Sequence, residues 1–576
     1  MAALFTTPKR NDKTPGAHFV EPDVRRRTLL AHGSWRRVTR RIVVGAVCAL
    51  TVSSLLMPNV SLAAEWVDIG GTQYNAGTAA GDEAGTWSWD GADDMKLNGY
   101  NGGAIQAAGK LNIAYEGKNT VKTEPDYTGA AIKAQDGTNQ IAELNITSSN
   151  STDELNVTAE ADAIKSTGDL SITGSGTVNA TGGTEGIQSK DKTTIDSSGT
   201  VIAKGNESYG ISAGSDLIIK GGGKVEASSI EEAAIWAEDG INISGGSQVK
   251  ANSEEDLAVD TEGSLAVTNA SLDASGVEYG VYAHKGITLD HANVTVRTSA
   301  SGGQAIALIT DGDDIVIKNG STVDAFAEGK FSVAISTRNH QPNVAGGHIY
   351  ISDSVVKAIA RYVETGGDGP DHHSNDQSGQ VIPEPRGLNI GIFAQTYEGI
   401  TPASISIVRS KVTAEGDTAA IFARAMSADG KTIGTIKIEN AAIQTPEGGK
   451  VIDYRKLRDG IYEAGQAIGT GDATVDSLYI KAVAKSTTIA PPEVAKPEDP
   501  KPDETKPAES KPAESKQNPK PEGSKPTKAV AASTTKAKTT GVLAATGDTS
   551  GAAIVATVLA GTAAIAAGTM ASRKRS

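Results

Sequence analysis

The strongest constraint on the fold of this chain is a repeat of 23 or 24 residues in its central region. Successive copies begin at Ala163, Gly186, Gly210, Ala234 and Ala258, each with a small residue followed by Ile or Val. Every copy holds three short segments of alternating apolar and polar residues separated by Gly, Asn, Asp or Ser, which is the pattern of strands and turns. One copy is too short to bury a core alone, so the copies must stack on one another.

Stacking predicts an all-β fold, a right-handed parallel β-helix with about 23 residues and three short strands per coil. The apolar residue after each start would form an interior ladder of Ile164, Ile187, Ile211, Ile235, Val259 and Val281. Looser copies start at Ala104 and Ala131, and later ones at Gly280, Ala305, Ala334, Gly391 and Ala420. A stack of small β-sandwiches is the alternative, but 23 residues are too few for each sandwich.

Residues 1–63 have the form of a secretory signal peptide. A basic region precedes an apolar stretch from Ile42 to Met57, and Ser61-Leu62-Ala63 supplies a small-x-small cleavage site. The only cysteine, Cys48, lies in that stretch, so the exported chain would hold no disulfide. The chain has a net charge of −15 and residues 1–63 contribute +7, which leaves −22 for the exported part. Such a charge argues against nucleic acid or anionic lipid as partners.

The C-terminal part has a different composition. Ten prolines lie between Pro491 and Pro526, where no core can form, so residues 481–542 are predicted to be a disordered linker that spans the cell wall. Residues 543–576 begin with Leu543-Ala544-Ala545-Thr546-Gly547 and end in a basic tail. Between them, residues 551–572 carry no charge and are long enough for a transmembrane helix.

This arrangement resembles the C-terminal sorting signal of cell-wall-anchored proteins in Gram-positive bacteria. Ala544 stands where that motif usually has proline, which looks like the variant read by some actinobacterial sortases. The resemblance implies that a sortase cleaves between Thr546 and Gly547 and joins Thr546 to peptidoglycan. A retained membrane anchor is the alternative.

Residues 64–103 are expected to cap the solenoid, and residues 104–480 to form the β-helix. The cap region holds a Trp-x-Trp-Asp-Gly segment starting at Trp87 and a Leu-Asn-x-Tyr-Asn-Gly segment starting at Leu97. Together with the repeats, these segments resemble a family of bacterial surface β-helix proteins. That family includes domains described as carbohydrate-binding, which attach to plant cell-wall polysaccharides and carry calcium. The resemblance therefore implies a β-helix that binds sugar.

A candidate carbohydrate site follows from the repeat. The residue after each ladder position should point outward, and in three successive copies this residue is Trp236, Asp260 or Tyr282. Trp236 and Tyr282 would lie two coils apart, roughly 9.6 Å, with Asp260 between them. Flat rings beside a carboxylate suit the stacking and hydroxyl recognition of a pyranose. Scattered surface aromatics are the alternative interpretation.

A candidate metal site comes from carboxylates that stand just before the coil starts. These are Glu185, Glu207, Glu232, Asp256 and Glu278. Stacked like charges destabilise a sheet unless water screens them or a cation bridges them, and Ca²⁺ suits such a corner. A solvated turn edge is the alternative. A separate long insertion at residues 361–386 holds Asp and His residues that could bind a transition metal, or it is a solvated loop.

No catalytic constellation is evident. The stretch from Gly210 to Gly214 matches a nucleophile elbow, but no helix follows it. Asp313-Asp314 and Gly347-His348 lack the partners of β-helix galacturonan hydrolases. The sequence thus predicts a monomeric, non-catalytic surface protein that binds polysaccharide or host glycan, with calcium as a possible cofactor. An adhesin for a protein partner, a structural spacer and a polysaccharide-degrading enzyme remain as alternatives.

Overall fold

The computed structural model describes residues 63–138, 140–339, 346–363, 388–397, 401–427, 430–458, 461–471 and 482–492. Within these ranges the regular elements are β-strands. No helix in them has the length and apolar character needed to cross a membrane. All but the last residue of the predicted signal peptide, the sorting signal with its 551–572 segment, most of the linker and most of the 361–386 insertion lie outside the described residues.

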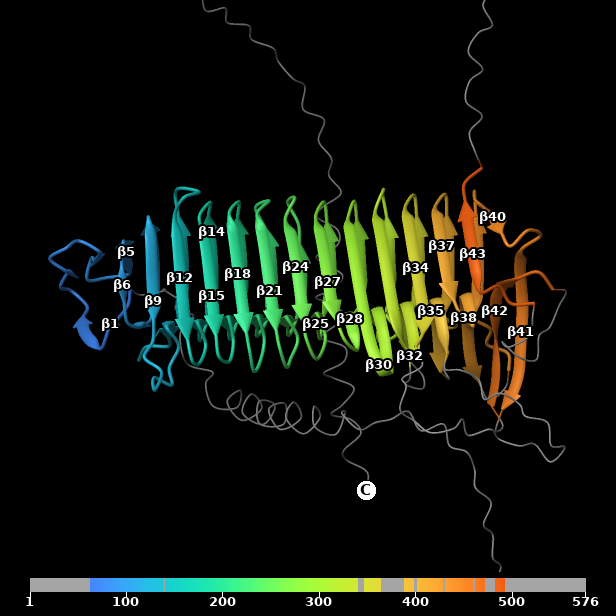
Figure 1. Ribbon diagram of the computed structural model, residues 1–576, viewed down its shortest axis with the longest axis horizontal. Helices are drawn as coiled ribbons and strands as arrows, with labels where there is room; N and C mark the ends of the chain where they lie inside the picture. Colours follow the sequence, from blue (N-terminus) through green and yellow to red (C-terminus); the bar gives the residue numbers. More distant parts are fainter. Residues whose placement is uncertain are drawn as a thin grey trace, which may run out of the picture. The chain divides into compact units, whose positions relative to one another are not determined.

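Each coil consists of three short strands, as the repeat predicts. One coil contains β13 (Ile164–Ser166), β14 (Asp169–Gly174) and β15 (Thr177–Gly182). Each of these strands pairs in parallel with the strand three places later, namely β16 (Ile187–Ser189), β17 (Thr193–Ser197) and β18 (Thr200–Gly205). The described part of the chain is therefore an all-β, parallel-strand solenoid, and Figure 1 shows its coils side by side along one axis.

The strands form three ladders. The first ladder also contains β7 (Ile105–Ala108), β10 (Ile132–Gln135), β19 (Ile211–Ala213), β22 (Ile235–Ala237), β25 (Val259–Thr261), β28 (Tyr279–Ala283), β35 (Asn389–Tyr397) and β38 (Ala419–Ser427). The second also contains β5 (Asp94–Asn98), β8 (Lys110–Glu116), β11 (Glu143–Ser148), β20 (Asp216–Lys220), β23 (Gly240–Ile243), β26 (Ser264–Thr268), β29 (Ile287–Asp290), β31 (Ile315–Lys318), β33 (His348–Ser352), β36 (Ser404–Val408) and β39 (Thr435–Glu439). The third also contains β6 (Asn101–Gly102), β9 (Lys118–Lys122), β12 (Glu154–Ala159), β21 (Lys224–Ser229), β24 (Gln248–Ser253), β27 (Ser271–Gly276), β34 (Val355–Tyr362) and β37 (Lys411–Gly416).

Two long strands belong to two ladders at once. β30 (Asn293–Thr310) and β32 (Thr322–Asn339) begin in the third ladder and end in the first. Their pairing shifts register between Ala300 and Gln304, where the chain passes from one face to the next. The corner that separates short strands in the earlier coils is thus bridged by continuous pairing in these two coils.

The predicted interior ladder is present. Its six members pair in register from coil to coil and are fully buried: Ile164, Ile187, Ile211, Ile235, Val259 and Val281. Each such side chain contributes roughly 1.5–3 kcal/mol when it leaves water. The stack of aliphatic rungs is therefore the main source of stability, and no single coil could supply it.

One expected coil start is wrong by two residues. Val281 pairs with Leu308, not with Ile306, so the ladder passes through Leu308 instead of the residue after Ala305. The stretch Ala305-Ile306-Ala307-Leu308 repeats the small-then-aliphatic pattern twice, and only the coil-to-coil pairing distinguishes the two copies. Ile306 consequently belongs to a different apolar cluster.

Antiparallel strands close the first coil. β1 (Trp66–Ile69) pairs antiparallel with both β2 (Thr72–Asn75) and β7. β4 (Trp87–Trp89) pairs antiparallel with β3 (Ala80–Gly81) and with β5, and both of its tryptophans are buried. Covering the open end with antiparallel strands prevents further parallel stacking there.

The last coil is also followed by antiparallel strands. β42 (Ile461–Gly469) pairs with β38 and with β41 (Lys450–Arg458), and β43 (Ser486–Ala490) pairs with β37 and with β40 (Ala442–Thr445). β43 lies inside the range predicted as linker, so the folded part extends past residue 480.

Candidate carbohydrate-binding face

The three residues of the predicted sugar site lie next to one another on the first ladder. Trp236 on β22 pairs with Asp260 on β25, and Asp260 pairs with Tyr282 on β28. All three side chains are half-buried, whereas the ladder residues beside them are fully buried. They therefore form one outward row on three successive coils, as expected from the repeat.

A fourth aromatic residue, Tyr209, completes a stacked pair that sequence reasoning missed. Its ring lies 5.5 Å from that of Trp236, with 18° between their planes. Tyr209 directly precedes the coil start at Gly210, so it comes from the corner and not from a strand. Its position one residue before the repeat start was the available signal, because corner residues can fold over the row of the next coil.

Tyr282 belongs to a second aromatic group. Its ring stacks on His284 at 4.2 Å and lies 5.3 Å from the ring of Tyr279. The Tyr282 hydroxyl donates to Asp311 Oδ1 at 2.7 Å, and His284 Nδ1 lies 3.0 Å from Asp311 Oδ2. Gln304 Nε2 donates to the Tyr279 hydroxyl at 2.6 Å. The ring orientations in this group are thus held by polar partners from the following coil.

Asp260 lies between the two aromatic groups. Its Oδ1 is buried without a hydrogen-bond partner, although 24% of the side chain is exposed. Burial raises the pKa of Asp260 to about 7, and the positive charge of His284 opposes that increase. His284 Nε2 lies 3.9 Å from Asp260 Oδ1. Burial would lower the pKa of His284, but the hydrogen bond to Asp311 and the charges of Asp311 and Asp260 raise it above its usual value.

Glu185 is a buried carboxyl on the same side of the solenoid. It accepts hydrogen bonds from Gln188 Nε2 at 2.6 Å and from the Ser212 hydroxyl. Burial raises the pKa of Glu185 to about 7 in spite of these two hydrogen bonds. Glu185 thus takes part in the packing between coils, because its partners lie on two successive coils, Gln188 on β16 and Ser212 on β19.

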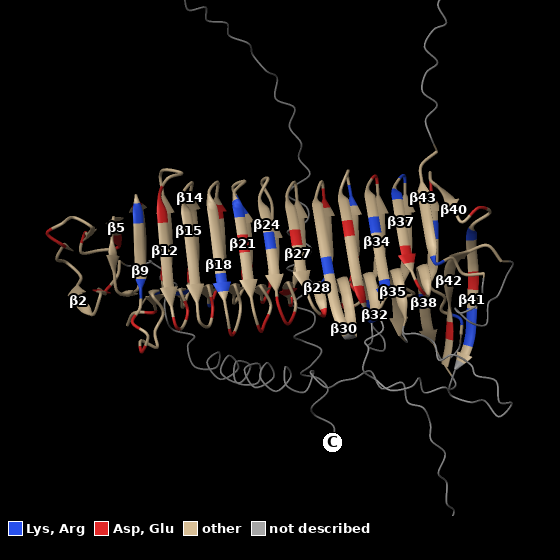
Figure 2. Ribbon diagram, viewed as in Figure 1, with Lys and Arg blue, Asp and Glu red and all other residues tan. Residues whose placement is uncertain are grey.

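The five predicted metal-site acids do not occupy equivalent positions. Glu185 is one residue before its coil start and Glu207 is three before, whereas Glu232, Asp256 and Glu278 are each two before. Only these last three occupy the same position on successive coils. In the described part of the chain, the one group of three carboxylates with ligand atoms within 4.8 Å of one another is Asp90, Asp93 and Asp94 in the N-terminal cap. Figure 2 nevertheless shows acidic residues concentrated at the turns below β12 to β27, which is the corner that precedes the first ladder.

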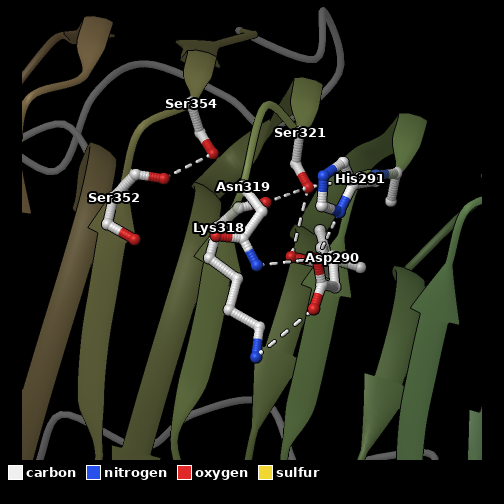
Figure 3. A network of polar contacts seen from close by, with 9 residues as sticks. Asp290, His291, Lys318, Asn319, Ser321, Ser352 and Ser354 are labelled. Carbon is white, nitrogen blue, oxygen red and sulfur yellow. Dashed lines mark hydrogen bonds and ion pairs between the residues drawn. The ribbon is translucent and has the colours of Figure 1, made fainter. Parts of the chain in front are cut away.

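The opposite corner, between the second and third ladders, has a different polar network (Figure 3). Asp290 accepts from Asn319 Nδ2 at 2.9 Å and forms an ion pair with Lys318 at 3.4 Å. His291 Nδ1 lies 2.7 Å from Asp290 Oδ1. His291 and Asn319 both have positive φ, 50° and 56°, at equivalent positions of successive turns. The network therefore holds left-handed turns in register, a structural role.

Comparisons with protein-family models, with curated proteins and with solved structures found no match for this chain. The sorting-signal residues Leu543, Ala544, Ala545, Thr546 and Gly547 lie outside the described residues. The interpretation of the site therefore depends on its own geometry and on the sequence.

Proposed function

We propose that this chain is a cell-wall-anchored surface protein whose right-handed β-helix binds carbohydrate without catalysis. The observation that carries the proposal is the row formed by Trp236, Asp260 and Tyr282, extended by the stacked ring of Tyr209. Aromatic faces with a carboxylate between them provide apolar stacking for a sugar ring and an acceptor for its hydroxyl groups. The row follows the solenoid axis, so the matching ligand is an extended glycan chain.

The sequence outside the described residues supports the presentation of this face at the cell surface. The signal peptide at 1–63 would direct export, and the sorting signal at 543–576, with its transmembrane helix at 551–572, would retain the chain for a sortase. The proline-rich linker would act as a disordered stalk that separates the solenoid from the peptidoglycan. These features support a role at the cell surface and an environment rich in glycans.

The test is a glycan array probed with the full chain and with its Trp236→Ala and Tyr282→Ala variants. We expect binding to an extended glycan that is lost in both variants, and retained in the control Tyr350→Ala, because Tyr350 is an exposed tyrosine on the second ladder. Unchanged binding in the two site variants would place the site elsewhere. No binding by a folded wild-type chain would contradict the proposal and favour a protein adhesin or a structural spacer.

Calcium enters the proposal through Glu232, Asp256 and Glu278, which follow one another at one corner. Oxygen ligands from such a corner suit Ca²⁺. The array is therefore run with calcium and with EDTA. Binding that EDTA abolishes would support a calcium-assisted site, whereas binding that is equal in both conditions would remove calcium from the proposal.

A further inference from the structure

The stacked pair of Tyr209 and Trp236 lies in an acidic environment. Burial raises the pKa of the Tyr209 hydroxyl, and the negative charges of four carboxylates raise it further. These carboxylates are Glu232, Asp260, Glu185 and Asp256. Their combined charge acts on an aromatic pair whose rings are only half-buried, so a ligand at this pair would experience a negative potential.

Asp260 brings one of these charges directly beside the rings. It pairs in register with Trp236, and a quarter of its side chain is open to solvent. Its buried Oδ1 makes no hydrogen bond, and its ion pair with His284 Nε2 is long, at 3.9 Å. A carboxylate in this position gains more from a positively charged ligand than from a neutral one.

The named basic groups along the row are already engaged with acids of their own. Lys165 lies three coils before Trp236 in the same row, and its Nζ is 2.6 Å from Asp162 Oδ2. His284 lies on the other side of Asp260, with its Nδ1 3.0 Å from Asp311. The charge of Lys165 is therefore directed at Asp162, whereas the charge of His284 is shared between Asp311 and Asp260.

We propose that this face prefers glycans whose sugars carry a positive charge, that is, amino sugars with a free or alkylated amine. The pyranose ring would stack on Trp236, and the ammonium group would lie against the electron-rich ring faces and the surrounding carboxylates. This preference rests on the proposed function, since it concerns the same face. With this preference, the protein would bind cationic amino-sugar polymers more tightly than neutral or acidic polysaccharides.

The test compares two oligosaccharide probes of equal length that differ in the charge of the nitrogen substituent. One is a glucosamine oligomer made permanently cationic by N,N,N-trimethylation, and the other is the neutral N-acetylglucosamine oligomer. For the full chain, titration calorimetry at about pH 8.5, where Asp260 and Glu185 are ionised because their pKa values are about 7, should show the cationic probe binding about tenfold more tightly. The preference should shrink when salt rises from about 0.05 M to about 0.5 M, because exposed charges are then screened.

Three single substitutions test whether the charge preference arises from this face. Asp260→Asn should reduce the affinity for the cationic probe severalfold and leave the neutral probe unchanged. The matched control Asp273→Asn removes an exposed carboxylate on the third ladder and should change neither affinity. Trp236→Ala should weaken both probes, since stacking is common to them.

The outcomes distinguish the two levels of the proposal. If the two probes bind equally, or the neutral probe binds more tightly, the charge preference is wrong. The sugar site itself would still be supported in that case, provided that Trp236→Ala weakens the binding. Tighter binding of the cationic probe that is unaffected by Asp260→Asn would also overturn the assignment to this face. No binding of any glycan would contradict the proposed function itself.

Discussion

The coils from β13 to β28 and those from β30 to β38 share one interior and differ in their outer surface. Val281, Leu308, Ile335, Ile392 and Ile421 continue the buried ladder without interruption. On the outward row of the first ladder, however, the earlier coils place polar and aromatic residues. The later coils place Ile309, Ser336, Phe393 and Phe422 there, and all four are buried.

The outward apolar residues of the later coils form a separate cluster. It joins Ile306, Val333 and Ile390 with the stacked rings of Phe393 and Phe422, 5.8 Å apart. Tyr454 on β41 packs edge-on against Phe422 at 5.5 Å. The same inward pattern thus builds a coil in both regions, and the outward residues decide whether the face is a surface or a second packed layer.

The comparison predicts a large difference between two aromatic residues in the same row. Phe422→Ala should lower the free energy of unfolding by about 3–5 kcal/mol, because it opens a cavity in the packed cluster. Trp236→Ala should cost about 1–2 kcal/mol, since its half-buried ring loses mainly the stacking on Tyr209. Denaturant unfolding of both variants measures the difference, and equal losses would show that the two faces are packed alike.

Glu185, a buried carboxyl of the earlier coils, should make their stability depend on pH. The pKa of Glu185 is about 7 in the fold against an ordinary value of 4.5, so the folded chain holds this proton more tightly than the unfolded chain. The corresponding stability is complete below pH 4.5 and is lost as the pH rises to about 7, a loss of about 3 kcal/mol.

Glu185→Gln should remove that part of the pH dependence. The unfolding free energy measured at about pH 4 and about pH 8 should then differ less in the variant than in the wild type. Glu207→Gln is the matched control, because Glu207 is exposed at the same corner. A variant profile parallel to that of the wild type would show that the carboxyl is not the source.

The smallest expected effect concerns the turns between the second and third ladders. Earlier coils place Gly221 and Gly245 at the left-handed position, whereas later coils place Asn269, His291 and Asn319 there. Asn319→Ala should cost about 1 kcal/mol, because alanine tolerates a φ of 56° poorly and loses the hydrogen bond to Asp290. Asn319→Gly should be closer to neutral in thermal unfolding, and the reverse order would remove backbone strain as the cause.

Much of the architecture was predictable because it depends on local alternation. The small-then-aliphatic starts identified the ladder from Ile164 to Val281, and the spacing implied three short strands per coil. The prediction failed at Ala305, where two overlapping copies of the pattern compete. It was incomplete for the metal-site acids, because Glu185, Glu207 and Glu232 precede their coil starts by different numbers of residues.

The site was predictable only along its row. Trp236, Asp260 and Tyr282 occupy the same place in successive repeats, so their alignment follows from the repeat length. Tyr209, His284 and Asp311 join them from corners and from neighbouring coils. No fixed spacing in the sequence marks these contacts.

The sequence by itself therefore determined the inward half of this protein, since alternation with period two decides which side chains face the axis. Only the tertiary structure decided the outward half. Whether Trp236 remains half-exposed, Phe422 is buried or Asp260 Oδ1 lacks a hydrogen-bond partner depends on how side chains from successive coils pack over one another. That packing is set by the register between coils and by the corners that join them, and both arise only when the solenoid is assembled.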